Sequence, residues 1–168
     1  MIVRKSQREE EFRVFFESEA ERLRRLALWL TGDVEAAPDL AQESLVRTYR
    51  HWGRIRNGDA APYARRVLVN LVRSSQRRRI IERRYLPRSA EPPRETSDRV
   101  ADWMQLAEAL RGLPPVRRAT VVLRYFEDMT EAEIAATLDR PLGTVKSDIH
   151  RSLKALRTLL EEESRDRT

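Results

Sequence analysis

A polar, proline-containing segment near the middle of the chain limits the size of any domain on either side of it. Residues 85–99, YLPRSAEPPRETSDR, contain three prolines, three Ser or Thr residues and little apolar character. Such a segment cannot bury a core and its prolines interrupt regular structure, so it is typical of a flexible linker. The 168-residue chain is thereby divided into two small domains, which we expect over residues 6–84 and 100–163.

Helical periodicity dominates the block before the linker. Apolar residues recur at intervals typical of a helix from Phe12 to Leu30, and Gly32 is expected to end that helix. Asp33 can cap a second helix that runs to the HWG sequence. Pro38 lies in the first turns of this helix, where its ring removes one backbone hydrogen bond, so we expect the helix to start or bend there.

Further helices complete the prediction of an all-α chain. Asp59 can cap a third helix, whose buried stripe is expected at Tyr63, Val67 and Leu71. After the linker, Gly and Pro separate four amphipathic stretches, VADWMQLAEALRGLPP, VRRATVVLRYFED, TEAEIAATLD and RPLGTVKSDIHRSLKAL. No strand pattern competes with them. The predicted fold class is therefore all-α, with two small helical bundles joined by a flexible linker.

The last two stretches have the pattern of a helix-turn-helix. Thr130 and Glu133 have the spacing of a capping box, which marks the start of a helix. Asp139 can take a left-handed conformation in the turn. Gly143 or Thr144 is expected to cap the second helix. The C-terminal bundle is thus predicted to present a DNA-reading helix.

The second helix of this pair has two chemically different faces. Its buried stripe is predicted at Val145, Ile149, Leu153 and Leu156. The side chains expected to face DNA are of types that bind phosphate and base edges in the major groove. They are Thr144, Lys146, Ser147, His150, Arg151 and Lys154.

One acid, Asp148, lies in the helix that should approach an acidic polymer. The helix macrodipole favours an acid near the start of a helix. The more common role of such an acid is to cap the helix or to pair with a neighbouring side chain. The alternative is that it accepts a hydrogen bond from the amino group of a cytosine.

Composition favours an anionic partner. The formal net charge is +6, and the 33 basic residues include three Lys, which leaves 30 Arg. Arg binds phosphate through a bidentate fork and stacks on bases, although Arg enrichment equally fits a GC-rich genome. The absence of Cys excludes disulfides, thiolate metal sites and Cys nucleophiles. With no apolar stretch of signal-peptide or membrane-span length, we expect a cytoplasmic protein that does not insert into a membrane and needs no metal or cofactor.

The stretch from residue 110 to 160 resembles the promoter-reading C-terminal domain of extracytoplasmic-function (ECF) sigma factors of bacterial RNA polymerase. The resemblance is carried by LPP, LRYFEDMT, EIA and GTVKS followed by HR. It implies that the helix-turn-helix binds the −35 promoter element. The family usually has a basic residue where this chain has Asp148, so the base preference of this member is not implied.

The first block resembles the N-terminal domain of the same family. LTGDVEAAPDLAQESLVRTYRHW is similar to its polymerase-binding segment, which implies that Asp39, Leu40, Gln42 and Glu43 contact core polymerase. An acidic, partly apolar face suits a protein partner, because DNA would repel it. Taken by itself, the same face could belong to a helix whose acids are merely solvated.

The stretch from residue 61 to 85 resembles the family segment that reads and opens the −10 element. Nine arginines there and just beyond stand against the single acid Glu82, and such a cluster would follow phosphates. The resemblance implies −10 contacts by Arg66, Asn70, Arg73, Arg77 and Arg78. It also implies that the loop at residues 53–61 receives an extruded base. Trp52 could stack at the melted junction or close the helical bundle.

Two departures from the family pattern indicate a subgroup. Many members carry Asp where this chain has Ser74, and Pro38 is unusual. Both suggest an actinobacterial-like member.

The resemblance implies a promoter-specificity subunit rather than an enzyme. Its implied partners are the clamp and flap of core RNA polymerase, promoter DNA and an anti-sigma factor. A second interpretation is a free-standing helix-turn-helix regulator, although the first block shows neither strands nor an acidic pocket for a sensor. A third, a nuclease, lacks a Gly-rich phosphate loop and a carboxylate cluster with metal-binding spacing.

Overall fold

The computed structural model describes residues 2–55, 58–82 and 98–166. Within these ranges the chain forms seven α-helices and one short 3-10 helix, without a strand, which confirms the all-α prediction. It divides into two compact units, Met1–Val72 and Arg73–Thr168. Most of the predicted linker lies outside the described residues, so the domain boundaries inferred from the sequence remain predictions.

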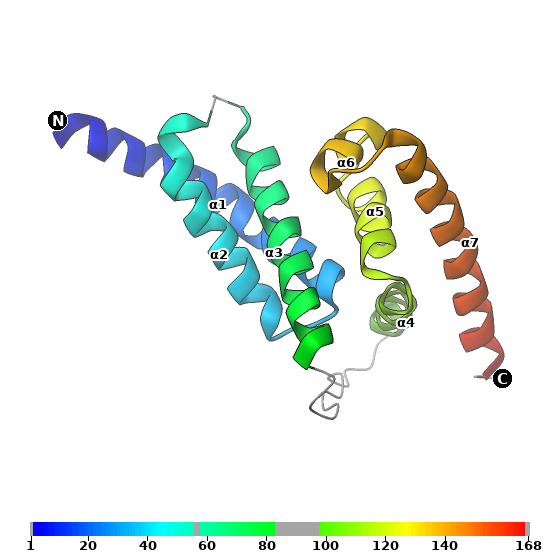
Figure 1. The fold of residues 1–168 in the computed structure, drawn as a ribbon. Helices are drawn as coiled ribbons and strands as arrows, with labels where there is room; N and C mark the ends of the chain where they lie inside the picture. The colour runs from blue at the N-terminus through cyan, green and yellow to red at the C-terminus, as the bar shows by residue number, and fades with distance from the viewer. Residues whose placement is uncertain (1, 56–57, 83–97, 167–168) are drawn as a thin grey trace. The chain divides into compact units, whose positions relative to one another are not determined.

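The first unit contains α1 (Ile2–Thr31), α2 (Ala36–His51), the 3-10 helix η1 (Trp52–Arg54) and the beginning of α3 (Ala60–Glu82), with α1 packed along α2 (Figure 1). The corner between α1 and α2 forms as predicted. Gly32 takes a left-handed conformation with φ 67°, which glycine adopts without a steric penalty. The Asp33 side chain then accepts hydrogen bonds from the backbone N–H groups of Glu35 and Ala36, at 3.0 and 2.9 Å.

The core of the first unit lies between these three helices, and its fully buried side chains include Leu23, Leu26, Leu30, Leu68 and Val69. The Ser44 hydroxyl donates to the carbonyl of Ala64 at 2.7 Å, a buried bond that joins α2 to α3.

The stripe predicted for α3 is confirmed only in part. Leu71 is buried as predicted, whereas Tyr63 and Val67 are half-buried and the neighbouring Ala64 and Leu68 are buried instead. In the sequence VLVNLV almost every residue is apolar, so periodicity alone does not identify the buried face.

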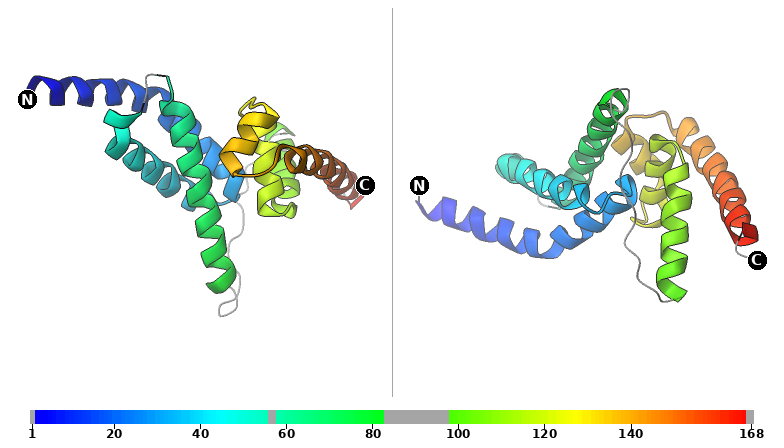
Figure 2. Two further views of the ribbon diagram at one scale, coloured as in Figure 1. Left: turned by 45° about the horizontal axis from the view of Figure 1, so that its top comes forward. Right: turned by 90° about the horizontal axis from the view of Figure 1, so that it is seen from below.

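Trp52 closes one end of the first bundle. Its ring centroid lies 5.1 Å from that of Phe12 and 5.0 Å from that of Phe15, both on α1. The Tyr49 ring packs on Phe12 at 4.8 Å, and Arg8 donates to the Tyr49 carbonyl at 2.9 Å. In Figure 2 the N-terminal turns of α1 extend past the end of α2. Trp52 is half-buried and closes the bundle, which is one of the two roles considered for it, and stacking at the melted junction stays a prediction.

The second unit contains α4 (Asp98–Gly112), α5 (Pro115–Tyr125), α6 (Glu131–Leu138) and α7 (Leu142–Asp166). The long α7 contacts the other three helices. Arg118 fastens the turn between α4 and α5, because its buried side chain donates to the carbonyls of Arg111 and Leu113 at 2.9 and 3.4 Å. Burial lowers the pKa of the Arg118 guanidinium.

The helix-turn-helix is formed by α6 and α7. The predicted capping box is present: Thr130 accepts from the Glu133 backbone N–H, and the Glu133 carboxylate accepts from the Thr130 N–H. Asp139 is left-handed, with φ 52° and ψ 57°. The predicted cap of α7 at Gly143 or Thr144 is wrong.

The helix α7 begins at Leu142, whereas a cap at Gly143 would have started it at residue 144. The Pro141 carbonyl accepts from the N–H groups of Thr144 and Val145, at 3.0 and 3.1 Å. Gly143 and Thr144 therefore lie inside the first turn. Proline favours this start because its fixed φ orders the residue before the helix.

A search of the described helices for a membrane-spanning segment finds none of sufficient length and apolarity. The same residues contain no group of three or more His, Asp or Glu side chains placed to share a metal ion.

Candidate nucleic-acid interface

The buried face of α7 combines apolar and small polar side chains. Val145, Ile149 and Leu156 are buried as predicted, whereas Leu153 is 43% exposed and the prediction for it is wrong. Ser152 is fully buried instead, and its hydroxyl donates to the Asp148 carbonyl at 2.6 Å. A buried hydroxyl is tolerated here because that bond satisfies it.

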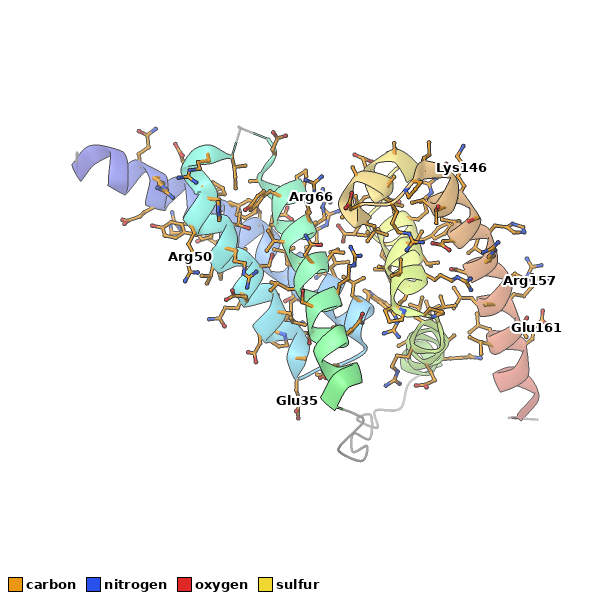
Figure 3. All side chains as sticks on the ribbon, viewed as in Figure 1. Glu35, Arg50, Arg66, Lys146, Arg157 and Glu161 are labelled. Atoms are coloured by element: carbon orange, nitrogen blue, oxygen red, sulfur yellow. The ribbon has the colours of Figure 1, made fainter. Side chains whose placement is uncertain are left out.

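The opposite half of α7 gathers the six predicted DNA-binding residues. Lys146, His150, Arg151 and Lys154 are exposed, and Thr144 and Ser147 are half-buried. Lys146 points outward from the N-terminal end of α7 (Figure 3), and its ammonium lies 3.8 Å from the Glu131 carboxylate of α6. Four groups that can donate to phosphates or base edges therefore share one accessible face.

Asp148 lies on the buried side of α7, at 6% exposure. Its Oδ1 is 3.6 Å from Nε of Arg117 on α5, and its Oδ2 is 3.4 Å from Nη2 of Arg140 in the turn before α7. The acid is thus paired with basic neighbours, as the first of its two possible roles predicts. Sequence reasoning missed both arginines, because their pairing depends on how α5 packs against α7.

A second polar face lies on α3. Arg66 and Asn70 are exposed and Arg73 is half-buried. These residues are four and three positions apart, so they form one row along the helix, opposite the buried Ala64 and Leu68. Figure 3 shows Arg66 projecting from this helix. The side chains of Arg77 and Arg78 lie outside those that the structure describes.

A face of different chemistry lies on α2. Asp39 and Gln42 are exposed, Glu43 is partly exposed, and Leu40 is half-buried at the edge of the face. The Glu43 carboxylate pairs with Arg47 at 2.7 Å.

Two neighbouring apolar residues of α2 differ in their exposure to solvent. Val46, one turn after Gln42, is 37% exposed, whereas Leu45 is in the core at 5%. The accessible face is thus acidic with one apolar side chain, and a protein is a better partner for it than DNA.

Comparison with known proteins finds a matching family model in each of the two parts of the chain. Residues 15–80 match the family model of sigma-70 region 2, and residues 103–156 match that of sigma-70 region 4. The chain is 38% identical over 160 residues to the RNA polymerase sigma-E factor of Streptomyces avermitilis, covering 93% of this chain and 88% of that protein. It is 34% identical over 161 residues to the ECF RNA polymerase sigma factor SigL of Mycobacterium tuberculosis, covering 89% of each.

A solved structure shares the fold. The sigma factor RpoE of Bartonella quintana, crystallised with the anti-sigma factor NepR, superposes with a TM-score of 0.77 at 22% identity, over 90% of this chain and 98% of that one. Together with the two family models and the relatives from actinobacteria, this likeness of fold confirms the resemblance inferred from the sequence. The chain belongs to the ECF family of RNA polymerase sigma factors.

Proposed function

We propose that three helix faces of this sigma factor each bind a different target. The outward face of α7 binds the −35 element, the row on α3 binds the −10 element, and the acidic face of α2 docks on the clamp of core polymerase. The polymerase performs the chemistry, in the bacterial cytoplasm, and this chain determines where transcription begins.

The observation that carries the proposal is the segregation on α7. Lys146, His150, Arg151 and Lys154 are exposed together, while Val145 and Leu156 are buried on the other side. A helix in the major groove needs such a face, because base edges are read by hydrogen bonds from side chains that the fold leaves accessible.

The proposal for α3 rests on charge and spacing. Arg66, Asn70 and Arg73 form one row, and the sequence continues it with Arg77 and Arg78. Basic side chains in a row can follow a phosphate backbone, and their binding should weaken steeply with salt.

The proposal for α2 rests on its acids. Asp39 and Glu43 would be repelled by DNA, whereas Gln42, Val46 and the half-buried Leu40 add the polar and apolar contacts of a protein interface. We further propose that the second unit reaches the polymerase flap.

We also propose control by an anti-sigma factor. It is supported by the Bartonella quintana sigma factor, whose fold this chain shares and which was crystallised with such a protein.

Run-off transcription tests the proposed function. The chain is combined with core polymerase of Streptomyces avermitilis and a genomic fragment library, and transcripts are sequenced from their 5′ ends. We expect start sites that share two upstream elements at a fixed spacing and that disappear when the chain is omitted. Start sites without shared elements would contradict the proposal.

A further inference from the structure

Asp148 is the residue of the recognition helix that the proposed function leaves unexplained. An acid in a helix that approaches phosphates lowers DNA affinity by simple charge repulsion. Here the acid is buried at 6% exposure and paired with two arginines from outside its own helix. The two ion pairs compensate the negative charge of Asp148, so that it repels the DNA backbone less. A role for the two arginines remains to be explained.

The position of Asp148 on α7 places the two arginines beside the predicted DNA face. Residues three and four positions away are neighbours on a helix surface, and for Asp148 these include Thr144 and Arg151. Both are predicted to bind DNA. The guanidinium groups of Arg117 and Arg140 lie 3.6 and 3.4 Å from the carboxylate. Because Asp148 neighbours Thr144 and Arg151 on the helix, we infer that both groups reach the edge of the recognition surface.

Each arginine keeps donors that Asp148 does not use. The carboxylate approaches Nε of Arg117 and Nη2 of Arg140. A guanidinium has five N–H donors in a rigid fork, and the side chains of Arg117 and Arg140 remain 35% and 32% exposed. One acid between two arginines leaves one net positive charge. The group can thus bind an anion without losing its internal pairs.

We propose that Asp148 is a positioning residue, which holds Arg117 and Arg140 as a two-arginine clamp for a backbone phosphate of promoter DNA. The inference rests on the proposed binding of the −35 element by α7. Without the carboxylate, both long side chains would have to be ordered when DNA binds, at a cost in affinity. The clamp binds a phosphate and so reads no base.

The positioning role and plain electrostatics predict opposite signs for the same substitution. Asp148→Asn removes a negative charge from a DNA-binding unit, so charge alone predicts tighter binding and a steeper salt dependence. Loss of positioning predicts weaker binding, by roughly three- to tenfold on any sequence, and a shallower slope of log K against log salt.

Glu131→Gln is the matched control. Glu131 is another acid of the same helix-turn-helix, but its partner Lys146 already points outward and is 3.8 Å away in a largely exposed pair. Its neutralisation should follow plain electrostatics and leave DNA binding equal or tighter. A fall for Asp148→Asn beside no fall for Glu131→Gln is the expected pattern.

The experiment uses the full chain assembled with core polymerase, and measures binding to two duplexes over a range of salt concentrations. One duplex is a promoter fragment recovered in the run-off screen, and the other is a scrambled duplex of equal length. Arg117→Gln and Arg140→Gln should each lower the salt slope by about one. In the background of both arginine variants, Asp148→Asn should no longer weaken binding, since its positioning effect acts through the two arginines.

The possible outcomes distinguish a failure of the proposed clamp from a failure of the proposed promoter binding. Equal or tighter binding by Asp148→Asn overturns the clamp, and so does a changed preference at a single base pair, which would mean that the acid reads a base. If Asp148→Asn fails to melt cooperatively, the arginine variants decide, and unchanged salt slopes for them overturn the clamp. If the unsubstituted holoenzyme does not distinguish the promoter from the scrambled duplex, the proposed function itself fails and this inference fails with it.

Discussion

Leu153 and Ser152 show how single side chains on α7 depart from the apolar pattern. The leucine is 43% exposed, and the neighbouring serine is fully buried with its hydroxyl bonded to the Asp148 carbonyl. The sequence suggests the reverse, because apolar type is the usual indicator of burial. What decides is the direction of each side chain from the helix axis, and 3.6-residue periodicity places position 152 directly beside the buried positions 145, 149 and 156.

Substitutions at two leucines test this assignment of faces. Leu156→Ala removes a side chain that is 7% exposed, and should lower the free energy of unfolding of the second unit by about 2–5 kcal/mol. Leu153→Ala should change it by less than about 0.5 kcal/mol, because the side chain is largely at the surface. Hydrogen exchange of the amides of α5 and α7 measures both values. Equal losses for the two variants would contradict the faces described.

Arg151 is the side chain we expect to read a base. Its replacement by Ala should cost roughly 1–3 kcal/mol of promoter binding and relax preference at one position of the −35 element, if the guanidinium is bidentate to a guanine. Arg157→Ala, at another exposed arginine of α7 (Figure 3), is the control and should leave base preference unchanged.

Binding-site selection with holoenzyme measures both variants. A uniform loss over all sequences for Arg151→Ala would assign it to the phosphate backbone instead.

At the scale of elements, several helix starts and stops were predictable, although the start of α7 was not. The corner at Gly32, the capping box at Thr130 and the left-handed Asp139 all depend on a few neighbouring residues, whose chemistry is visible in the sequence. The complete buried face of α3 and the identity of the two arginines that pair with Asp148 were not predictable, since they depend on which helix packs against which.

The acidic face of α2 should be a docking element for core polymerase. Reversal of charge at Asp39 and Glu43, both to Lys, is expected to weaken association with core polymerase and leave the helical circular dichroism unchanged. The control reverses Glu10 and Glu17 on α1, which are exposed and paired with Arg13 as Glu43 is with Arg47.

Co-purification with core polymerase distinguishes the two double variants. Retention of both at the level of the unsubstituted chain would remove the assignment of α2.

The C-terminal part of α3 should contribute charge rather than sequence reading. Neutralising Arg77 and Arg78, both to Gln, is expected to reduce promoter opening on all sequences and to lower the salt slope by about one for each lost phosphate contact. Arg24→Gln with Arg25→Gln on α1 removes the same charge from residues paired with Glu21, and should have a smaller effect.

Permanganate reactivity of unpaired thymines reports promoter opening directly. A loss limited to one promoter sequence would mean that Arg77 and Arg78 read bases.

For the whole molecule, the central question is whether two small units act as one promoter reader. Each has a core of its own, and we propose one DNA-binding face on α3 and one on α7. Two weak sites joined by a tether gain affinity only when both can reach their targets together. Core polymerase would supply that geometry by binding the chain, which separates a sigma factor from a free-standing regulator of the same fold class.

Footprinting of one promoter fragment, with and without core polymerase, tests this claim most directly. We predict protection of both the −35 and −10 elements by the chain with core polymerase, no protection by core polymerase alone, and little by the chain alone. Lengthening the spacer by about half a helical turn, 5 base pairs, should abolish simultaneous protection, because it rotates one element to the opposite side of the duplex. Full protection of the promoter by the chain without core polymerase would contradict the account.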